Sequence, residues 1–456
     1  MQQIITAKLK LETTTEQLVQ LRQTQLAYRD ALNFVSRYAF EHGKVSSAKR
    51  LHNGTYRDIR SIFNLPSQMA CSVMRQVVTT YKGLWMKLSK NIEHRRSGYT
   101  KRRFKGLDKP PKYISPTVTY VHGHDYGFKS DQNVSVLTLF GRITLPYQGY
   151  SRHLALIHHG ATIGEAKLWY DKRHRQYYLL VSLKLEMSDP TQEIQRTVIG
   201  VDVGQRYLAV TSTMAEESQF YSGKAVRAKA DRYARLQKRL QRKGTRGATK
   251  RLIAISGRER RFKLQTNHVI AKTIVTAHPH TLIGMESLTG IREHARRSKW
   301  FRRKGKQPHL SSLKQRRANR HASTWAFDEL QEMIGYKAAL SSSQAITIDA
   351  DYTSKTCPLC GYADRQNRPY GGLVFACQNN VCPYRLRVGH AYTLHADLIG
   401  ARNIAMRTLL IRQDWVRTGV LPVRPGSDGP NVSDREAKAA RLSRYAELRW
   451  SSDASS

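Results

Sequence analysis

Two apolar segments of this chain each carry an acidic residue at or near their end, and a third acid opens a late helical segment. The two apolar segments are TVIGVDVG at 197–204, which contains Asp202, and TLIGMES at 281–287, which contains Glu286. The late segment, DLIGARNIAMRTLL at 397–410, begins with Asp397. A carboxylate among apolar, β-branched neighbours is costly to bury without a partner. The pattern therefore favours a functional role for these acids.

The elements around the three acids follow the order of an RNase H-like fold. They are the strands 197–204, YLAVTST and SQFYS, a helical stretch at 224–263, the strand 281–287, a helix from Ser323 to about Ser342 capped by Ser323 or Thr324, the strand 345–350 and the closing helix. In that fold the three acids meet at one edge of the sheet. Carboxylates are ligands that Mg²⁺ accepts, and two ions roughly 3.5–4 Å apart can hydrolyse a phosphodiester. We predict that the Mg²⁺-binding catalytic residues are Asp202, Glu286 and Asp397.

Each acid also has a simpler interpretation. An Asp or Glu at a strand end is often a cap or faces solvent, and any one of the three taken alone could be structural. Asp349, Asp351 and Asp364 are near Asp397 in the sequence and compete with it for the third position.

The first 195 residues are predicted to form one strand, then helices, then many strands. Residues 1–11 alternate like a strand, and residues from about 14 to 95 have helical spacing with a break at Leu65-Pro66-Ser67. A basic connector follows at 101–113. In 115–195 the expected strands are TVTYVHG, VSVLTLFGRITLP, LALIHHG, EAKLWYD and QYYLLVSLKLE. This order predicts a β-barrel interrupted by a helical domain, in an α+β multidomain protein.

Four of the five cysteines lie within 26 residues. Cys357 and Cys360 form a C-x2-C pair, and Cys377 and Cys382 form a C-x4-C pair 16 residues later. Four thiolates with no open position are typical of structural Zn²⁺. If Cys382 does not bind the metal, His390 or His395 could replace it as a ligand. The simpler alternative is that the two cysteine pairs are unrelated, reduced thiols that bind no metal. The fifth cysteine, Cys71, is expected to be a small core residue of a helix.

The charge of the chain indicates a polyanionic partner. Lys and Arg total 77 against 34 Asp and Glu, a net charge of +43, and this excess favours nucleic acid. A disordered basic tail is excluded by 23 Tyr, 11 Phe and 6 Trp. No apolar run of membrane length and no signal peptide is evident, so we expect a cytoplasmic protein, associated with the nucleoid in a prokaryote.

Four motifs carry a family resemblance. VIGVDVGQRYLAV, LIGMESLTGI, SKTCPLCG and DLIGARNIA resemble the three RuvC motifs and the zinc module of the transposon-encoded TnpB nucleases, and of the compact type V CRISPR effectors derived from them. RYARLQKRLQRK is similar to the region between the first two motifs. The resemblance implies a RuvC-type, RNA-guided, Mg²⁺-dependent DNA endonuclease that cuts beside a short adjacent motif. Its partners would be a guide RNA and double-stranded target DNA, in a monomeric ribonucleoprotein or a dimer.

The resemblance also assigns domains and nucleic-acid contacts. The domains would be a wedge strand (1–11), a helical recognition domain (12–114), a wedge β-barrel (115–195), the nuclease domain (196–352 and 385–415), a zinc module (353–384) and a loosely ordered tail (416–456). The contacts would come from the basic runs 224–251 and 292–320 and from polar residues of the helical insert. The candidates are Tyr56, Ser67, Gln68, Arg235, Lys238, Arg239, Arg242, Arg302 and Arg303. Tyr233, Leu236 and Leu240 are expected as a buried stripe, and Trp300, Phe301 and Trp325 as core or stacking residues.

The sequence departs from the family pattern at the third motif, where Ile399 and Gly400 replace an Asn and an Ala. Two other functions stay open. One is a guide-directed DNA-binding repressor with weak or no cleavage. The other is an RNase H-like transposase, although such enzymes carry their acids in the order Asp, Asp, Glu.

Overall fold

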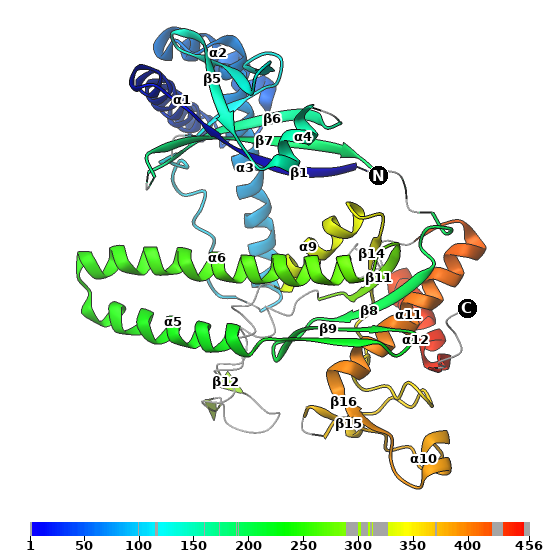
Figure 1. Cartoon of the computed structure of the whole chain (residues 1–456). Helices are drawn as coiled ribbons and strands as arrows, with labels where there is room; N and C mark the ends of the chain where they lie inside the picture. Colours follow the sequence, from blue (N-terminus) through cyan, green and yellow to red (C-terminus); the bar gives the residue numbers. More distant parts are fainter. Residues whose placement is uncertain are drawn as a thin grey trace. The chain divides into compact units, whose positions relative to one another are not determined.

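The computed structural model describes most of the chain as two compact units. They are Met1–Met187 and Ser188–Ser456, and each is considered by itself (Figure 1). The described residues are 2–98, 100–114, 117–158, 160–172, 174–187, 189, 191–288, 300–301, 309–310, 312, 327–369, 372–421 and 432–450. Within these ranges no helix combines the length and the apolar character needed to cross a bilayer.

The first unit contains a nearly closed antiparallel sheet of seven strands, in the order β2-β6-β7-β1-β5-β4-β3. The strands are β1 (Gln2–Leu11), β2 (Thr117–Tyr120), β3 (Tyr126–Lys129), β4 (Asn133–Thr138), β5 (Gly141–Gln148), β6 (Thr162–Asp171) and β7 (Gln176–Glu186). The edge strands β2 and β3 follow one another in sequence and are joined by a tight turn, in which the Tyr126 amide donates to the Val121 carbonyl over 3.3 Å. The strands expected at TVTYVHG, EAKLWYD and QYYLLVSLKLE are confirmed as β2, β6 and β7.

Three helices are inserted between β1 and β2: α1 (Thr15–Glu41), α2 (Ala48–Phe63) and α3 (Ser67–Arg96). A capping box starts α1, because the Thr14 hydroxyl accepts from the Gln17 amide and the Gln17 side chain accepts from the Thr14 amide. The break expected at Leu65-Pro66-Ser67 separates α2 from α3, since proline disfavours helix for the residue before it.

Two expectations for these strands were wrong. The residues LALIH of the segment LALIHHG belong to a helix, α4 (Ser151–His158), because a short apolar run does not distinguish a strand from a helix that buries one side, here at Ile157. VSVLTLFGRITLP is two strands, since Leu139 and Phe140 turn the chain and Thr138 pairs with Gly141 across the β4–β5 hairpin.

The second unit is built on a five-stranded mixed sheet in the order β10-β9-β8-β11-β14. Antiparallel β8 (Thr197–Asp202), β9 (Tyr207–Thr213) and β10 (Ser218–Ser222) form a meander, and β11 (Thr281–Glu286) and β14 (Gln344–Ile348) add parallel to β8. The remaining elements are α5 (Lys224–Lys243), α6 (Arg246–Ala277), β12 (Trp300–Phe301), β13 (His309–Leu310), α9 (Phe327–Ala339), the 3-10 turn η1 (Arg365–Asn367), β15 (Val374–Ala376), α10 (Pro383–Val388), β16 (Thr393–His395), α11 (Ala396–Thr418) and α12 (Val432–Glu447). The predicted cap residues Ser323 and Thr324 lie outside the described residues.

Helices cover both faces of this sheet, which explains why β8 and β11 are apolar at nearly every position. On one face Ile199, Val201, Ile283 and Met285 pack with side chains of α6 and α9. On the other face Val198 and Leu282 pack with α11. Side chains alternate along a strand, so Asp202 and Glu286 lie on the α11 face, at the ends of their strands.

Two glycines bring α11 close to the sheet. A Cβ at Gly200 would meet the Ala401 carbonyl and the Ala405 amide, and a Cβ at Gly284 would meet the side chain of Thr408. The obstacle at Gly200 is helix backbone, which cannot rotate away.

We expect Gly200→Ala to lower the melting temperature of the second unit. Overpacking of this kind costs roughly 1–3 kcal/mol, because α11 must move off β8. Gly335→Ala in α9 is the matched control, since a Cβ there meets nothing within 4 Å. Equal melting temperatures for the Gly200 variant and wild type, measured by calorimetry, would contradict the close approach.

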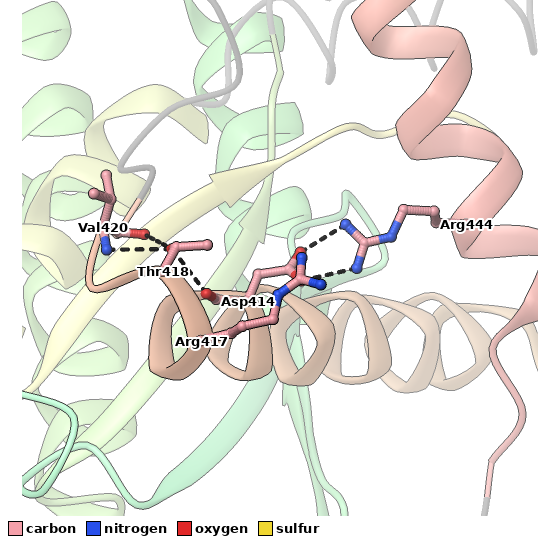
Figure 2. A network of polar contacts seen from close by, with 5 residues as sticks. All are labelled: Asp414, Arg417, Thr418, Val420 and Arg444. Atoms are coloured by element: carbon pink, nitrogen blue, oxygen red, sulfur yellow. Dashed lines mark hydrogen bonds and ion pairs between the residues drawn. The ribbon is translucent and has the colours of Figure 1, made fainter.

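The C-terminal segment differs from the loosely ordered tail that the sequence predicts. The helix α11 continues to Thr418, and α12 is anchored by the buried rings of Tyr445 and Trp450. Figure 2 shows the polar link between α11 and α12, in which Arg444 donates to both Asp414 oxygens over 2.7 and 2.9 Å. The expectation failed because these partners are distant in sequence.

This link should depend on pH. The hydrogen bond from Arg444 is the main cause that lowers the pKa of Asp414. A lowered carboxyl pKa stabilises the folded state above the ordinary carboxyl pKa, and this stabilisation disappears as the pH falls through the folded-state value. We therefore expect lower protection factors for the amides of α12 below about pH 4, after correction for the intrinsic exchange rate, by an amount equivalent to at most about 1 kcal/mol because both side chains are partly exposed. Arg444→Gln should remove this part of the pH dependence, and an unchanged dependence in that variant would contradict the link.

Candidate active site and metal centre

The strand register brings two of the predicted acids to the same edge of the sheet. Strands β8 and β11 are parallel, with Val201 opposite Met285, so Asp202 and Glu286 leave neighbouring strands at the same level. Asp397 lies in the first turn of α11, where the helix dipole favours a carboxylate. His395 caps this helix by accepting from the Asp397 amide over 3.2 Å. Two of the acids therefore lie on the sheet face that α11 covers, and the third lies at the N-terminal end of α11.

Gly400 lies directly against the first acid. A Cβ at this position would stand 2.8 Å from Oδ2 of Asp202. The glycine that replaces an alanine of the family pattern therefore leaves room for the carboxylate against α11.

The electrostatics of the site are those of crowded, partly buried carboxylates. Burial is the main cause that raises the pKa of Asp202 well above its usual value, and the carboxylates of Glu286 and Asp397 add to it. Burial also raises the pKa of Glu286, while a hydrogen bond from the Thr353 hydroxyl lowers it. A bound cation would relieve this repulsion, and three hard oxygen donors fit a divalent ion such as Mg²⁺.

Arg368 is a residue of this site that the sequence analysis missed. Its guanidinium lies 3.6 Å from Asp397 Oδ1, and it also lowers the pKa of both Asp202 and Glu286. Its Nε donates to the Gly372 carbonyl over 2.8 Å, which fixes the side chain. No local pattern distinguishes this arginine among 77 Lys and Arg residues.

The three competing acids have other partners. Asp349 is paired with Arg441 at 2.8 Å, Asp351 is paired with Lys438 at 2.7 Å, and Asp364 caps η1. None of the three is among the carboxylates that act on Asp202, although Asp351 contributes to the raised pKa of Glu286.

The four clustered cysteines come together. Within the described ranges they are the one group of three or more metal-ligating side chains whose donor atoms all lie within 4.8 Å of one another. Gly361, at φ +73°, closes the turn after the first pair, and Cys382 precedes α10. A hydrogen bond from the Cys357 thiol lowers the pKa of Cys360. Four convergent sulfurs fit a tetrahedral Zn²⁺ site.

The other predicted ligands and the lone cysteine lie elsewhere. His390 packs on Tyr384, and His395 contacts the rings of Tyr207 and Phe220. Cys71 lies in α3 against the core of the first unit, as expected.

The predicted nucleic-acid contacts fall into three groups. Arg235, Lys238, Arg239 and Arg242 are all exposed on α5 at the spacing of one helix face, while Tyr233, Leu236 and Leu240 pack toward α6 as expected. Ser67 is exposed at the start of α3, Gln68 is half-buried, and Tyr56 stacks on His52 in α2. Arg302, Arg303, Trp325 and the side chains of Trp300 and Phe301 lie outside the described residues.

Comparison with known proteins places two family domains on this chain. Residues 182–290, which contain Asp202 and Glu286, match the OrfB_IS605 family, described as "Probable transposase". Residues 327–404, which contain the four cysteines and Asp397, match the Cas12f1-like TNB domain.

Individual relatives are distant in sequence. The CRISPR-associated endodeoxyribonuclease Cas12f1 of Sulfoacidibacillus thermotolerans is 24% identical over 429 residues, which cover 85% of this chain and 92% of the relative. The TnpB-like protein MJ0751 of Methanocaldococcus jannaschii is 34% identical over 127 residues, which cover 27% and 38%. The solved structure of the mini-RNA-guided endonuclease CRISPR-Cas_phi3 aligns over 94% of both chains at 10% identity, with a TM-score of 0.48. The domain and sequence matches confirm the resemblance of this chain to the TnpB nucleases and to the compact type V CRISPR effectors.

Proposed function

We propose that the protein is an RNA-guided DNA endonuclease with a RuvC-type active site. The observation that carries the proposal is the meeting of Asp202, Glu286 and Asp397 at one edge of the five-stranded sheet. The family matches support it, because they cover all three acids and the relatives are named as DNA endonucleases.

Each residue of the site has a role in this proposal. The three carboxylates hold Mg²⁺, and bound Mg²⁺ supplies an activated water and stabilises the leaving oxygen of the phosphodiester. Arg368 offers positive charge beside Asp397, where the substrate phosphate gains negative charge. The four cysteines hold structural Zn²⁺. The domain divisions named above, apart from the loosely ordered tail, are part of the same proposal.

The first test is the RNA that accompanies the protein. We expect the protein purified from its native locus to carry one defined RNA, and the loaded protein to cut double-stranded DNA that matches this RNA beside a short motif. A spacer-bearing CRISPR RNA would favour the CRISPR branch, and an RNA from a transposon end would favour TnpB. Absence of a defined RNA would count against the proposal.

The exposed face of α5 should bind phosphates of the guide RNA. Its four basic residues are spaced 235, 238, 239 and 242, so they form one stripe opposite the contact with α6. We expect replacement of all four by Gln to weaken RNA binding and to lower the slope of log K against log salt by about 0.7 for each phosphate that these side chains no longer neutralise.

A matched control keeps the change in net charge equal. Lys10, Lys109, Lys129 and Lys172 are exposed and scattered over the first unit. Their replacement by Gln should leave most of the salt slope intact. RNA binding is measured by fluorescence anisotropy at several salt concentrations. If the slope of log K against log salt is the same for the two quadruple variants, α5 contributes only to the overall charge and the predicted phosphate contacts are wrong.

A further inference from the structure

We propose that Thr353 is a positioning residue for Glu286, and that the C-terminal helix α12 holds Thr353 in place through the loop 349–356. This inference rests on the proposed function, since it concerns the same carboxylate site. It assigns a task to a helix that is distant from Glu286 in sequence.

The first step is the contact between Thr353 and Glu286. The Thr353 hydroxyl donates to Oε1 of Glu286, and the side chain is only 3% exposed. The same hydroxyl lies 3.2 Å from the Ala350 carbonyl. A hydroxyl has one proton, and a charged acceptor forms the stronger bond. The hydroxyl hydrogen therefore points to the Glu286 carboxylate, and this hydrogen bond restricts the rotation of Glu286.

The second step is the hold of α11 on the loop 349–356. Asn403 Nδ2 donates to the Thr353 carbonyl over 2.6 Å and to the Thr356 carbonyl over 2.9 Å. Arg407 donates to the carbonyls of Asp349 and Asp351 over 2.6 and 2.7 Å. Both donors belong to the helix that carries Asp397, so the loop and the third acid share one support.

The third step is the hold of α12 on the same loop. Arg441 Nε donates to Asp349 Oδ2 over 2.8 Å, and Lys438 pairs with Asp351 at 2.7 Å. Tyr445 lies under the Arg407 guanidinium, 4.5 Å from its ring centre. The loop is therefore held between α11 and α12, and α12 also supports the arginine that binds the loop from the other side.

The backbone of the loop shows why such support is needed. Tyr352, directly before Thr353, has φ +59°, in the left-handed region that is unfavourable for a residue with a Cβ. A conformation of this kind persists when the surrounding contacts determine it. Loss of these contacts should let the loop relax and move the Thr353 hydroxyl away from Glu286.

The experiment compares Thr353→Val, which keeps the shape and removes the donor, with Thr353→Ser, which keeps the donor. We expect the Val variant to need about tenfold more Mg²⁺ for half-maximal cleavage, and to bind Mn²⁺ about tenfold more weakly in the ribonucleoprotein without DNA, as measured by electron paramagnetic resonance. The Ser variant should recover both values. Thr408→Val is the matched control, because that buried hydroxyl donates only to the Ile404 carbonyl of its own helix.

A purely structural role would lower the melting temperature without changing the metal dependence. Values for Thr353→Val within twofold of wild type, in both metal assays, would overturn the positioning role. Asp202→Asn in the same assays separates this outcome from failure of the proposed function. If Asp202→Asn abolishes cleavage and Thr353→Val does not change the metal dependence, only the present inference fails.

A double-mutant cycle tests the part played by α12. Asp349→Asn with Arg441→Gln removes the tether without leaving a buried charge unpaired. If α12 acts through Thr353, the Asp349→Asn/Arg441→Gln variant should need more Mg²⁺ than wild type for half-maximal cleavage. Adding the same two substitutions to Thr353→Val should then raise the Mg²⁺ requirement little further. Independent, multiplying effects would overturn the route through Thr353. The pair should leave guide RNA binding unchanged, since none of these residues lies on the basic face of α5.

Discussion

Replacement of Asp202 by Asn should lower the rate of guided DNA cleavage by at least about 1,000-fold, because a metal site contributes several kcal/mol of charge stabilisation and each 1.36 kcal/mol is a factor of ten. Asn has nearly the same size as Asp and cannot supply the charge. Binding of the guide RNA and of target DNA should persist. In the absence of Mg²⁺ the variant should melt at an equal or higher temperature, since the carboxylates of Glu286 and Asp397 disfavour a charge at Asp202.

The matched control for this variant is Asp364→Asn. Asp364 is an acid of the cysteine-rich segment 353–384 that caps η1 by accepting from the Gln366 amide over 2.6 Å, and Asn preserves that cap. Its cleavage rate should equal that of wild type. Undiminished cleavage by Asp202→Asn would remove the catalytic assignment, and would leave the guide-directed repressor or another nuclease site to be considered.

Loss of the zinc site should have the second large effect. We expect one Zn²⁺ per chain in native mass spectrometry, and none in Cys382→Ser or after treatment with a strong chelator. Structural zinc contributes about 10–16 kcal/mol of apparent binding free energy in small zinc-finger peptides, so residues 353–384 should lose protection from hydrogen exchange. Cleavage should fall as well, because Arg368 belongs to this segment and lies beside Asp397.

Cys71→Ser provides the control for the thiol change itself. Cys71 lies in α3, apart from the four clustered cysteines, so its replacement should leave the zinc content at one. Equal zinc content in Cys382→Ser and wild type would contradict the assignment of that ligand.

The sequence predicted the sheet of the second unit well, because its signals are local. Strands β9 and β10 have the expected bounds, 207–213 and 218–222, because both segments are short and rich in β-branched or aromatic residues. The same holds for the cysteines, whose spacing is itself the signal. The stripe of Tyr233, Leu236 and Leu240 was predicted from helical spacing and packs as expected.

The parts that could not be predicted depend on partners far apart in the chain. Arg368 and Thr353 reach the acids through tertiary contacts, and neither has a motif around it. The segment RPGSDGPNVSD suggested a loose tail, yet α12 begins within its last three residues, and Arg441 and Arg444 of this helix pair with acids at 349 and 414. The helix α4 was missed because its apolar run is too short to show a period.

The close contact of α11 with Gly200 has a consequence for how such a protein can evolve. At Gly200 the backbone of β8 lies directly against the backbone of α11. The spacing between the helix and the sheet therefore does not depend on which apolar side chains fill the surrounding layer. Substitutions at Val198, Leu282 or Ile404 would change how tightly that layer is filled, while Asp397 would keep its distance from the strand ends. Lineages of this chain can therefore diverge widely in their interior, and a mutational library randomised at these positions should be limited by folding yield before it loses the arrangement of the three acids.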